Sequence, residues 1–205
     1  MTLQNGLIHK GKAYLWTDTL AVDHLGNEMH VSKAMVGLNW PWAGVYSGLM
    51  LSADPGRVAG LIGRAIPRNP SELIDACRAA LRAEMDEGRH GRLLMAYASR
   101  RHGARMFLMG NYSDILQIAP YEVQETVQHA CSPADENWNQ AFADREFTPL
   151  EMRQFIGEQV KRPAAPPHGS FGGAFGGNLI ELRISPTGVR PRQIGDIEHT
   201  NKRPA

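Results

Sequence analysis

The spacing of apolar residues switches along the chain between the two-residue period of strands and the longer period of helices. Strand-like segments come first, two helical stripes follow, and strands and helices then return before a closing hairpin pattern. We predict strands at residues 3–9, 12–17, 31–38, 42–46, 93–99, 105–109, 115–118, 178–184 and 189–194, and favour a strand over a helix for 121–130. We predict helices at residues 52–64, 70–87, 134–143 and 149–160, and loops at 18–30 and 162–177.

This order of elements favours an α+β fold, because a parallel sheet would need strict alternation of strands and helices. Capping-box signals support two of the helices: Asn69 stands three residues before Glu72, and Thr148 three residues before Glu151. Two antiparallel sheets packed together, with helices outside, would bury all the apolar stripes. We therefore expect a four-layer α/β/β/α sandwich of two antiparallel sheets, formed by one domain over residues 1–196 with a polar tail at 197–205.

The charge balance narrows the classes of partner. The chain has 22 basic and 21 acidic side chains and a formal net charge of +1, which argues against a dedicated nucleic-acid or membrane-surface binder. Every apolar run is shorter than the roughly 20 residues of a membrane span, and no secretory leader pattern opens the sequence. The two cysteines, Cys77 and Cys131, suit a reducing compartment. We expect a cytoplasmic protein without a nucleic-acid or membrane partner.

Several motif-like segments lack the context that their chemistry needs. Residues 6–13 approximate a phosphate-binding loop, but Ala13 stands where the Mg²⁺-binding hydroxyl belongs. The glycines of residues 169–177 precede a strand, whereas a dinucleotide fingerprint follows one. His24 and His30 share a loop without a third ligand in register. We therefore expect no cofactor and no metal.

Two further segments have structural as well as functional interpretations. Cys131-Ser132 could supply a reactive thiol, although a cysteine without a chemical role is the more frequent case. Trp40-Pro41-Trp42 could form a small-ligand surface, although tryptophans more often belong to a core or an interface.

One constellation at the start of the chain matches a known pattern. Thr2 precedes a short apolar strand, a glycine turn at Gly11 and a second strand that ends at Asp18. A polar loop then leads to Lys33, and another strand ends in residues 43–48 just before a helix. This order and spacing resembles the N-terminal half of proteasome β-type subunits. It also resembles the bacterial proteasome-like peptidase that partners a ring ATPase.

A second similarity lies near the end of the chain, where Gly176-Gly177 leads into a strand as it does in that family. The resemblance implies an N-terminal-nucleophile hydrolase fold, an amide-bond hydrolase activity on a peptide or small acyl-amide, and assembly into a homo-oligomeric ring. An ATPase partner is not identifiable from the residues.

The resemblance also implies a role for each matched residue. Thr2 would be the nucleophile, Lys33 the cation beside it, and Asp18 the carboxylate that orients Lys33. Gly48, or less favourably Gly44, would donate a backbone N–H to the oxyanion. Each residue also has an ordinary structural explanation. Asp18 at a strand end suits a turn, Lys33 could be a solvated strand residue, and glycines are common before a helix.

The chemistry explains why these residue types are needed together. A threonine hydroxyl is a poor nucleophile and requires a nearby base. Removal of Met1 would free the α-amino group of Thr2, whose ordinary pKa of about 7.7–8.0 suits a general base near neutral pH. A neighbouring lysine stabilises the developing alkoxide and lowers the pKa of that amine by repulsion.

Departures from the family pattern point to weak activity. The aspartate and serine that support the nucleophile's amine in the family fall near Gly172 and Phe175, and another supporting serine maps loosely to Ser132. Neither Gly172 nor Phe175 offers a side-chain acceptor. The alternative interpretation is a non-catalytic structural or assembly protein of the same fold.

Overall fold

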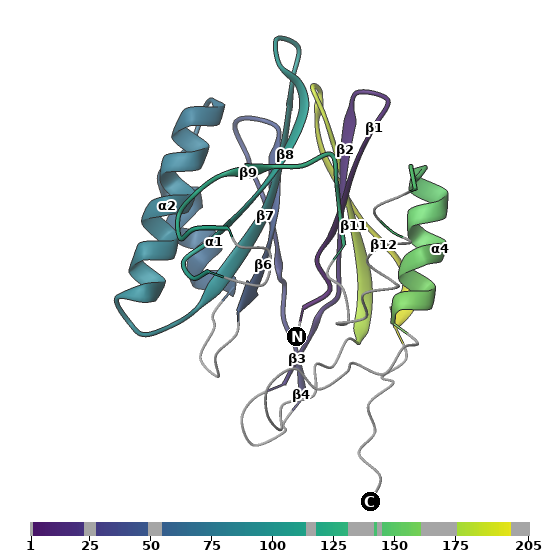
Figure 1. Cartoon of the computed structure of the whole chain (residues 1–205), viewed down its shortest axis with the longest axis horizontal. Helices are drawn as coiled ribbons and strands as arrows, with labels where there is room; N and C mark the ends of the chain where they lie inside the picture. Colours follow the sequence, from purple (N-terminus) through teal and green to yellow (C-terminus); the bar gives the residue numbers. More distant parts are fainter. Residues whose placement is uncertain are drawn as a thin grey trace, which may run out of the picture.

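The computed structural model describes residues 2–22, 28–48, 55–113, 118–130, 142, 145–160 and 176–197. These residues form two five-stranded sheets, a short two-stranded hairpin and three helices (Figure 1). All strand pairs are antiparallel. The chain therefore has a mixed α and β structure with antiparallel sheets, as the predicted α+β class requires.

The first sheet joins the two ends of the chain and has the strand order β10-β1-β2-β11-β12. Its strands are β1 (Asn5–His9), β2 (Lys12–Thr17), β10 (Gln128–His129), β11 (Gly177–Ser185) and β12 (Gly188–Ile197). The turn between β1 and β2 is formed by Lys10 and Gly11, with φ of 48° and 70°, the backbone of a tight hairpin turn. The segment that approximates a phosphate-binding loop is this hairpin.

The second sheet has the order β5-β6-β7-β8-β9. Its strands are β5 (Ala34–Val36), β6 (Trp42–Gly48), β7 (Gly91–Ser99), β8 (Gly103–Gly110) and β9 (Gln124–Glu125). Successive side chains of a strand point to opposite faces, and β7 serves both: Leu93 and Met95 pack on the helix side, Leu94 and Ala96 on the other. The sheet is therefore buried on both faces.

Helices cover the outer face of each sheet (Figure 1). α1 (Pro55–Arg64) and α2 (Pro70–Met85) pack on the second sheet, and α4 (Pro149–Gln159) packs on the first. Both predicted helix starts are confirmed: the Asn69 side chain accepts from Glu72 N at 3.0 Å, and Thr148 forms a complete capping box with Glu151. These caps satisfy N–H groups that the first helical turn leaves without partners.

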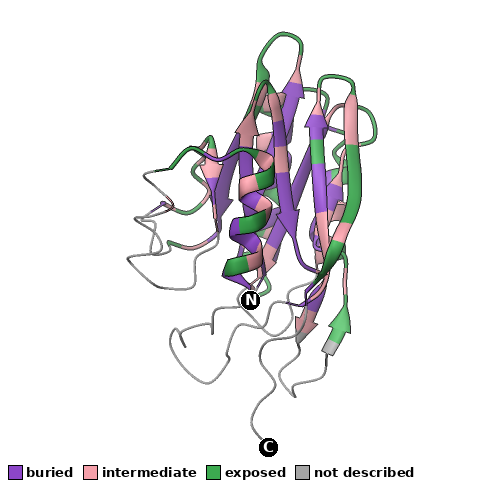
Figure 2. Cartoon of the chain, turned by 90° about the vertical axis from the view of Figure 1, so that its right-hand side faces the viewer, coloured by how far each residue is buried: buried purple, intermediate pink, exposed green. Residues whose placement is uncertain are grey.

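An apolar layer fills the space between the sheets, and Figure 2 shows buried residues along the facing strands. Gly6 on β1 is part of the close approach. A Cβ at this position would lie 3.1 Å from Leu94 and 3.2 Å from Leu15, and still closer to the sulfur of Met106. Because real Cβ atoms seldom come this near, any larger residue at position 6 would force the Met106, Leu94 and Leu15 side chains to shift.

The structure corrects the prediction of one long loop over residues 18–30. This segment contains two paired strands, β3 (Leu20–Val22) and β4 (Glu28–His30). Three-residue strands are too short to show an alternating pattern, and their pairing depends on contacts elsewhere: Leu20 N donates to Gly176 O at 3.1 Å. Tertiary contacts therefore override a polar, irregular sequence.

The strand predicted over residues 121–130 is confirmed only in part. The segment forms two separate two-residue strands, β9 in the second sheet and β10 in the first. Predictions for residues 115–117, 134–141 and 162–175, and for the tail from 198 onward, lie outside the described residues. β12 extends through Ile197, which is 7% exposed.

The tryptophan segment is mainly core. Trp42 is 3% exposed, and the Trp40 ring lies 5.2 Å from that of Tyr97. Cys77, on α2, is also fully buried, and burial raises the pKa of its thiol. Among the described helices, none combines the length and apolar character needed to cross a bilayer.

A buried carboxylate holds α1 and α2 to the second sheet. Glu84 on α2 is fully buried, and its oxygens lie 3.3 Å from Arg89 and 3.7 Å from Arg57. The Tyr46 hydroxyl from β6 donates to the same carboxylate at 3.4 Å. A buried charge depends strongly on such partners, because removing one member leaves the others uncompensated.

We predict that Glu84→Ala lowers the free energy of unfolding by about 3 kcal/mol, because two arginines and a buried hydroxyl lose a common acceptor. Urea unfolding measures the change. The matched control is Glu87→Ala, since Glu87 contacts the same two arginines but is 42% exposed. Equal losses in the two variants would contradict this account of Glu84.

Candidate functional site

The carboxylate of Asp18 is the centre of a buried polar cluster at the end of β2. Lys33 Nζ donates to Oδ1 at 2.8 Å, and the backbone N–H of Leu3 donates to the same oxygen at 2.9 Å. The N–H of Gly176 donates to Oδ2 at 3.3 Å. Asp18 and Lys33 are 0% and 4% exposed. One carboxylate therefore binds three segments that are far apart in sequence.

The local fold explains how these groups meet. Asp18 directly follows β2, Leu3 precedes β1, and Gly176 precedes β11, so all three lie at one end of the first sheet. Lys33 directly precedes β5 of the second sheet, and its carbonyl accepts from Tyr46 N at 3.0 Å. The ion pair therefore joins the two sheets at this end.

The electrostatics of the pair are set by opposing effects. Burial raises the pKa of the Asp18 carboxyl above its ordinary value, and the Lys33 ammonium and the N–H groups of Leu3 and Gly176 lower it. All three neighbouring groups are donors, which is the environment that stabilises an ionised carboxylate. The arrangement holds the Lys33 ammonium at a fixed place beside the start of the chain.

Thr2 lies next to this pair. It is 6% exposed, and the following residue, Leu3, is the one whose N–H binds Asp18. The Leu3 side chain packs in the α4-side core, whereas Gln4 reaches across to Val45 O of the second sheet at 2.9 Å.

The two glycines predicted as oxyanion donors lie in different environments. Gly44 is in the middle of β6 and is paired with Met35 on one side and Met95 on the other. Gly48 is the last residue of β6 and is paired with Gly91 only. The pairing with β5 ends before Gly48, so its position suits a site at the strand end better than that of Gly44 does.

Sequence reasoning missed a second polar group near Thr2. Gln4 accepts from Arg92 Nε at 3.0 Å, and Arg92 in turn lies close enough to His129 to lower the pKa of that histidine. Gln4 is fully buried and His129 is 8% exposed. The signal available was a polar residue within, or directly before, the strand-like segments 3–9, 93–99 and 121–130.

Gly177 fixes the end of the first sheet against the β3–β4 hairpin. Its φ is 73°, and a Cβ there would lie 2.5 Å from Thr19 Oγ1 and 2.7 Å from the His30 ring. The Thr19 hydroxyl lies 3.1 Å from His30 Nδ1 and accepts from Asn178 N at 2.9 Å. Only glycine can adopt this positive φ and also leave room for these close neighbours. The N–H of the preceding residue, Gly176, donates to Asp18.

The structure pairs Lys33 with Asp18, binds the N–H of Leu3, the residue after Thr2, to the same carboxylate, and places Gly48 at the end of β6. Four other positions raised by the sequence, Ser132, Cys131, Gly172 and Phe175, lie outside the described residues, as does His24. In the described part of the chain, no three histidine, cysteine or acidic side chains are grouped as metal ligands.

Comparisons with known proteins add no family to this picture. No protein-family model matches the chain, and no curated protein matches its sequence. The functional interpretation therefore depends on the residues and their geometry.

We predict that His129 makes the fold sensitive to acid. Burial and the charge of Arg92 lower its pKa from 6.5 to about 3, so the unfolded chain binds the proton more readily. The stabilisation from neutral His129 is present above pH 6.5 and is lost as the pH falls towards 3. From pH 7 to pH 5 this group should reduce the free energy of unfolding by about 2 kcal/mol.

Urea unfolding at both pH values tests this. His129→Gln should lose less stability between pH 7 and pH 5 than the parent protein does. His102→Gln, at an exposed turn position, should keep the parent dependence. An unchanged pH dependence in His129→Gln would show that His129 does not titrate as proposed.

Proposed function

We propose that the protein is an amide-bond hydrolase that uses Thr2 as an N-terminal nucleophile. We also propose that its sheets and helices form the four-layer α/β/β/α sandwich of N-terminal-nucleophile hydrolases. The observation that carries the proposal is the buried Lys33–Asp18 pair, whose carboxylate also holds the backbone of the residue after Thr2. If Asp18 only formed a surface turn and Lys33 were only a solvated strand residue, neither side chain would need to be buried.

The proposed reaction begins once Met1 has been removed. The Thr2 Oγ attacks the carbonyl carbon of the substrate while its proton passes to the α-amino group. The Lys33 ammonium stabilises negative charge on Oγ, and the Gly48 N–H stabilises the oxyanion. The C–N bond then breaks, the amine product leaves with the proton, and water hydrolyses the acyl-Thr2 ester.

The burial of Asp18 gives it a positioning role. It does not touch the reacting atoms; it holds the Lys33 ammonium and the Leu3 N–H on one oxygen. This fixes the cation relative to the nucleophile, and errors of about 1 Å in such placement can cost on the order of 10²-fold in rate.

We predict that Lys33→Ala reduces hydrolysis of a fluorogenic peptide amide by on the order of 10²–10³-fold, because the developing alkoxide loses its cation. The same change also leaves a buried carboxylate unpaired, which costs about 3 kcal/mol in stability. The double variant Asp18→Asn/Lys33→Met removes both charges, so it should recover much of the stability and remain inactive. A folded double variant with parental turnover would refute the role of Lys33.

Thr2 is tested separately, with variants whose small second residue still permits methionine removal. Thr2→Ser should retain hydrolysis and Thr2→Ala should abolish it. The intact mass of each natively expressed protein shows whether Met1 is gone. An electrophile that captures both a hydroxyl and an amine should label processed Thr2. Retained Met1, or a processed protein with neither labelling nor hydrolysis, would support the non-catalytic structural alternative.

We further propose a closed homo-oligomer of six or more copies. Of the apolar residues in the first half of the chain that could serve an interface, Met35, Trp42 and Tyr46 are core, whereas Met29 is 46% exposed. Leu38 in the β5–β6 connection is 96% exposed and is a second apolar side chain that an interface could cover. Symmetric association would cover such residues.

Sedimentation at micromolar concentration should therefore give a mass at least six times 22.6 kDa. Leu38→Asp should shift the distribution towards smaller species, because a charge at a buried contact is unfavourable. The exposed variant Arg101→Asp, in the β7–β8 turn, is the control. A monomer alone would contradict ring assembly while leaving the test of Thr2 independent.

A further inference from the structure

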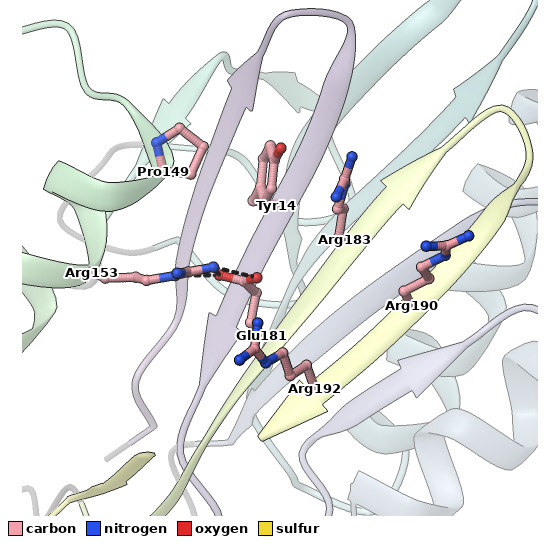
Figure 3. Close-up of a pocket in the computed structure, with 7 residues that line it drawn as sticks. All are labelled: Tyr14, Pro149, Arg153, Glu181, Arg183, Arg190 and Arg192. Carbon is pink, nitrogen blue, oxygen red and sulfur yellow. Dashed lines mark hydrogen bonds and ion pairs between the residues drawn. The ribbon is translucent and has the colours of Figure 1, made fainter. Parts of the chain in front are cut away.

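A pocket rich in arginine lies on the outer face of the first sheet, beside α4 (Figure 3). Its volume is about 350 Å³. The lining residues come from β2, β11, β12 and the first turns of α4, and are Tyr14, Pro149, Arg153, Glu181, Arg183, Arg190 and Arg192. Four arginines against one glutamate give this lining a formal charge of +3, whereas the whole chain carries only +1.

The strand register places the arginines side by side. Arg183 on β11 is directly opposite Arg190 on β12, and Glu181 is opposite Arg192. Tyr14 on β2 is opposite Arg183. Side chains two residues apart share a face of the sheet, so Arg183, Arg190 and Arg192 all belong to the outer face, as Figure 3 shows.

The single acidic residue is already used. Glu181 is 5% exposed, and its two oxygens accept from Arg153 Nε and Nη2, each at 2.7 Å. The same carboxylate accepts from the Trp16 indole at 2.9 Å. This bidentate pair fixes α4 against the sheet.

The remaining three arginines are uncompensated. Within the described part of the chain, Arg183, Arg190 and Arg192 have no ion-pair or hydrogen-bond partner. All three are exposed. Like charges directly opposite each other on neighbouring strands are destabilising. An anion between the guanidinium groups would remove this repulsion, and binding of such an anion would explain why three arginines are placed together.

The size and walls of the pocket narrow the class of anion. A volume of about 350 Å³ is at the lower end of small-molecule sites. Guanidinium forks match phosphate oxygens in pairs. Tyr14 and Pro149 add ring surfaces to the wall of the pocket.

From these observations we propose that the pocket between β2, β11, β12 and α4 binds a small phosphorylated ligand with two adjacent phosphate groups. Arg183 and Arg190 bind one phosphate together and Arg192 binds the next. Arg153 and Glu181 are positioning residues that hold the wall of the pocket. The site is separate from Thr2, because Gly176 at the Asp18 cluster and Arg183 are about 23 Å apart along the extended chain.

Calorimetric titration of the full chain with pyrophosphate, in low-salt buffer free of phosphate, tests the proposal. Saturable binding is expected, and Arg190→Gln and Arg192→Gln should each weaken it at least tenfold. Arg101→Gln removes the same charge from an exposed turn and should leave the affinity within twofold. Circular dichroism and the urea midpoint confirm that each variant is folded.

Other outcomes would overturn the proposal. These are the absence of saturable pyrophosphate binding, and equal affinity in Arg190→Gln and the parent. Succinate binding as tightly as pyrophosphate would overturn the phosphate class and leave only a general anion site. A fall in oligomer size in Arg190→Gln/Arg192→Gln would show that a second copy of the chain occupies the pocket instead.

Discussion

The carboxylate of Asp18 connects three parts of the molecule that the rest of the structure does not connect so directly. It accepts from Lys33 beside the second sheet, from Leu3 at the start of the first sheet, and from Gly176 at its C-terminal half. Each of these segments is irregular at the point of contact, so this buried group adds a direct link between them. Burying a carboxylate costs stability unless each of its oxygens accepts a hydrogen bond. Both oxygens of Asp18 do so. The geometry of the proposed nucleophile follows from the same contacts.

Burial of polar groups recurs at the interfaces between layers. Glu84 joins the helices to the second sheet, Gln4 and Arg92 join the two sheets, and Glu181 joins α4 to the first sheet. The apolar clusters between the layers supply the nonspecific attraction. The polar contacts add direction, because each is satisfied only when the elements meet in one register.

Much of the architecture could be predicted from the sequence because long elements carry their own signals. The helix stripe of α2, its Asn69 cap and the β11–β12 hairpin are all set by local patterns, and the structure confirms them. The β3–β4 hairpin and the split of residues 124–129 between two sheets could not be predicted, since such short strands exist only through tertiary pairing. In the candidate site, Thr2, Asp18 and Lys33 were expected only because of a family resemblance, and the structure pairs Asp18 with Lys33. The Gly176 amide, Gln4 and Arg92 were not expected, because their roles arise from contacts between distant segments.

The pairing of β2 with both β1 and β11 has a consequence for synthesis of the chain. The β1–β2 hairpin is synthesised before β11, so one edge of β2 stays without its partner until residues 177–185 have been made. Contacts of such long sequence separation form slowly, and an unpaired edge invites pairing with other chains. Nascent chains should therefore depend on protection of that edge, and truncation before β11 should yield aggregates rather than a smaller folded unit.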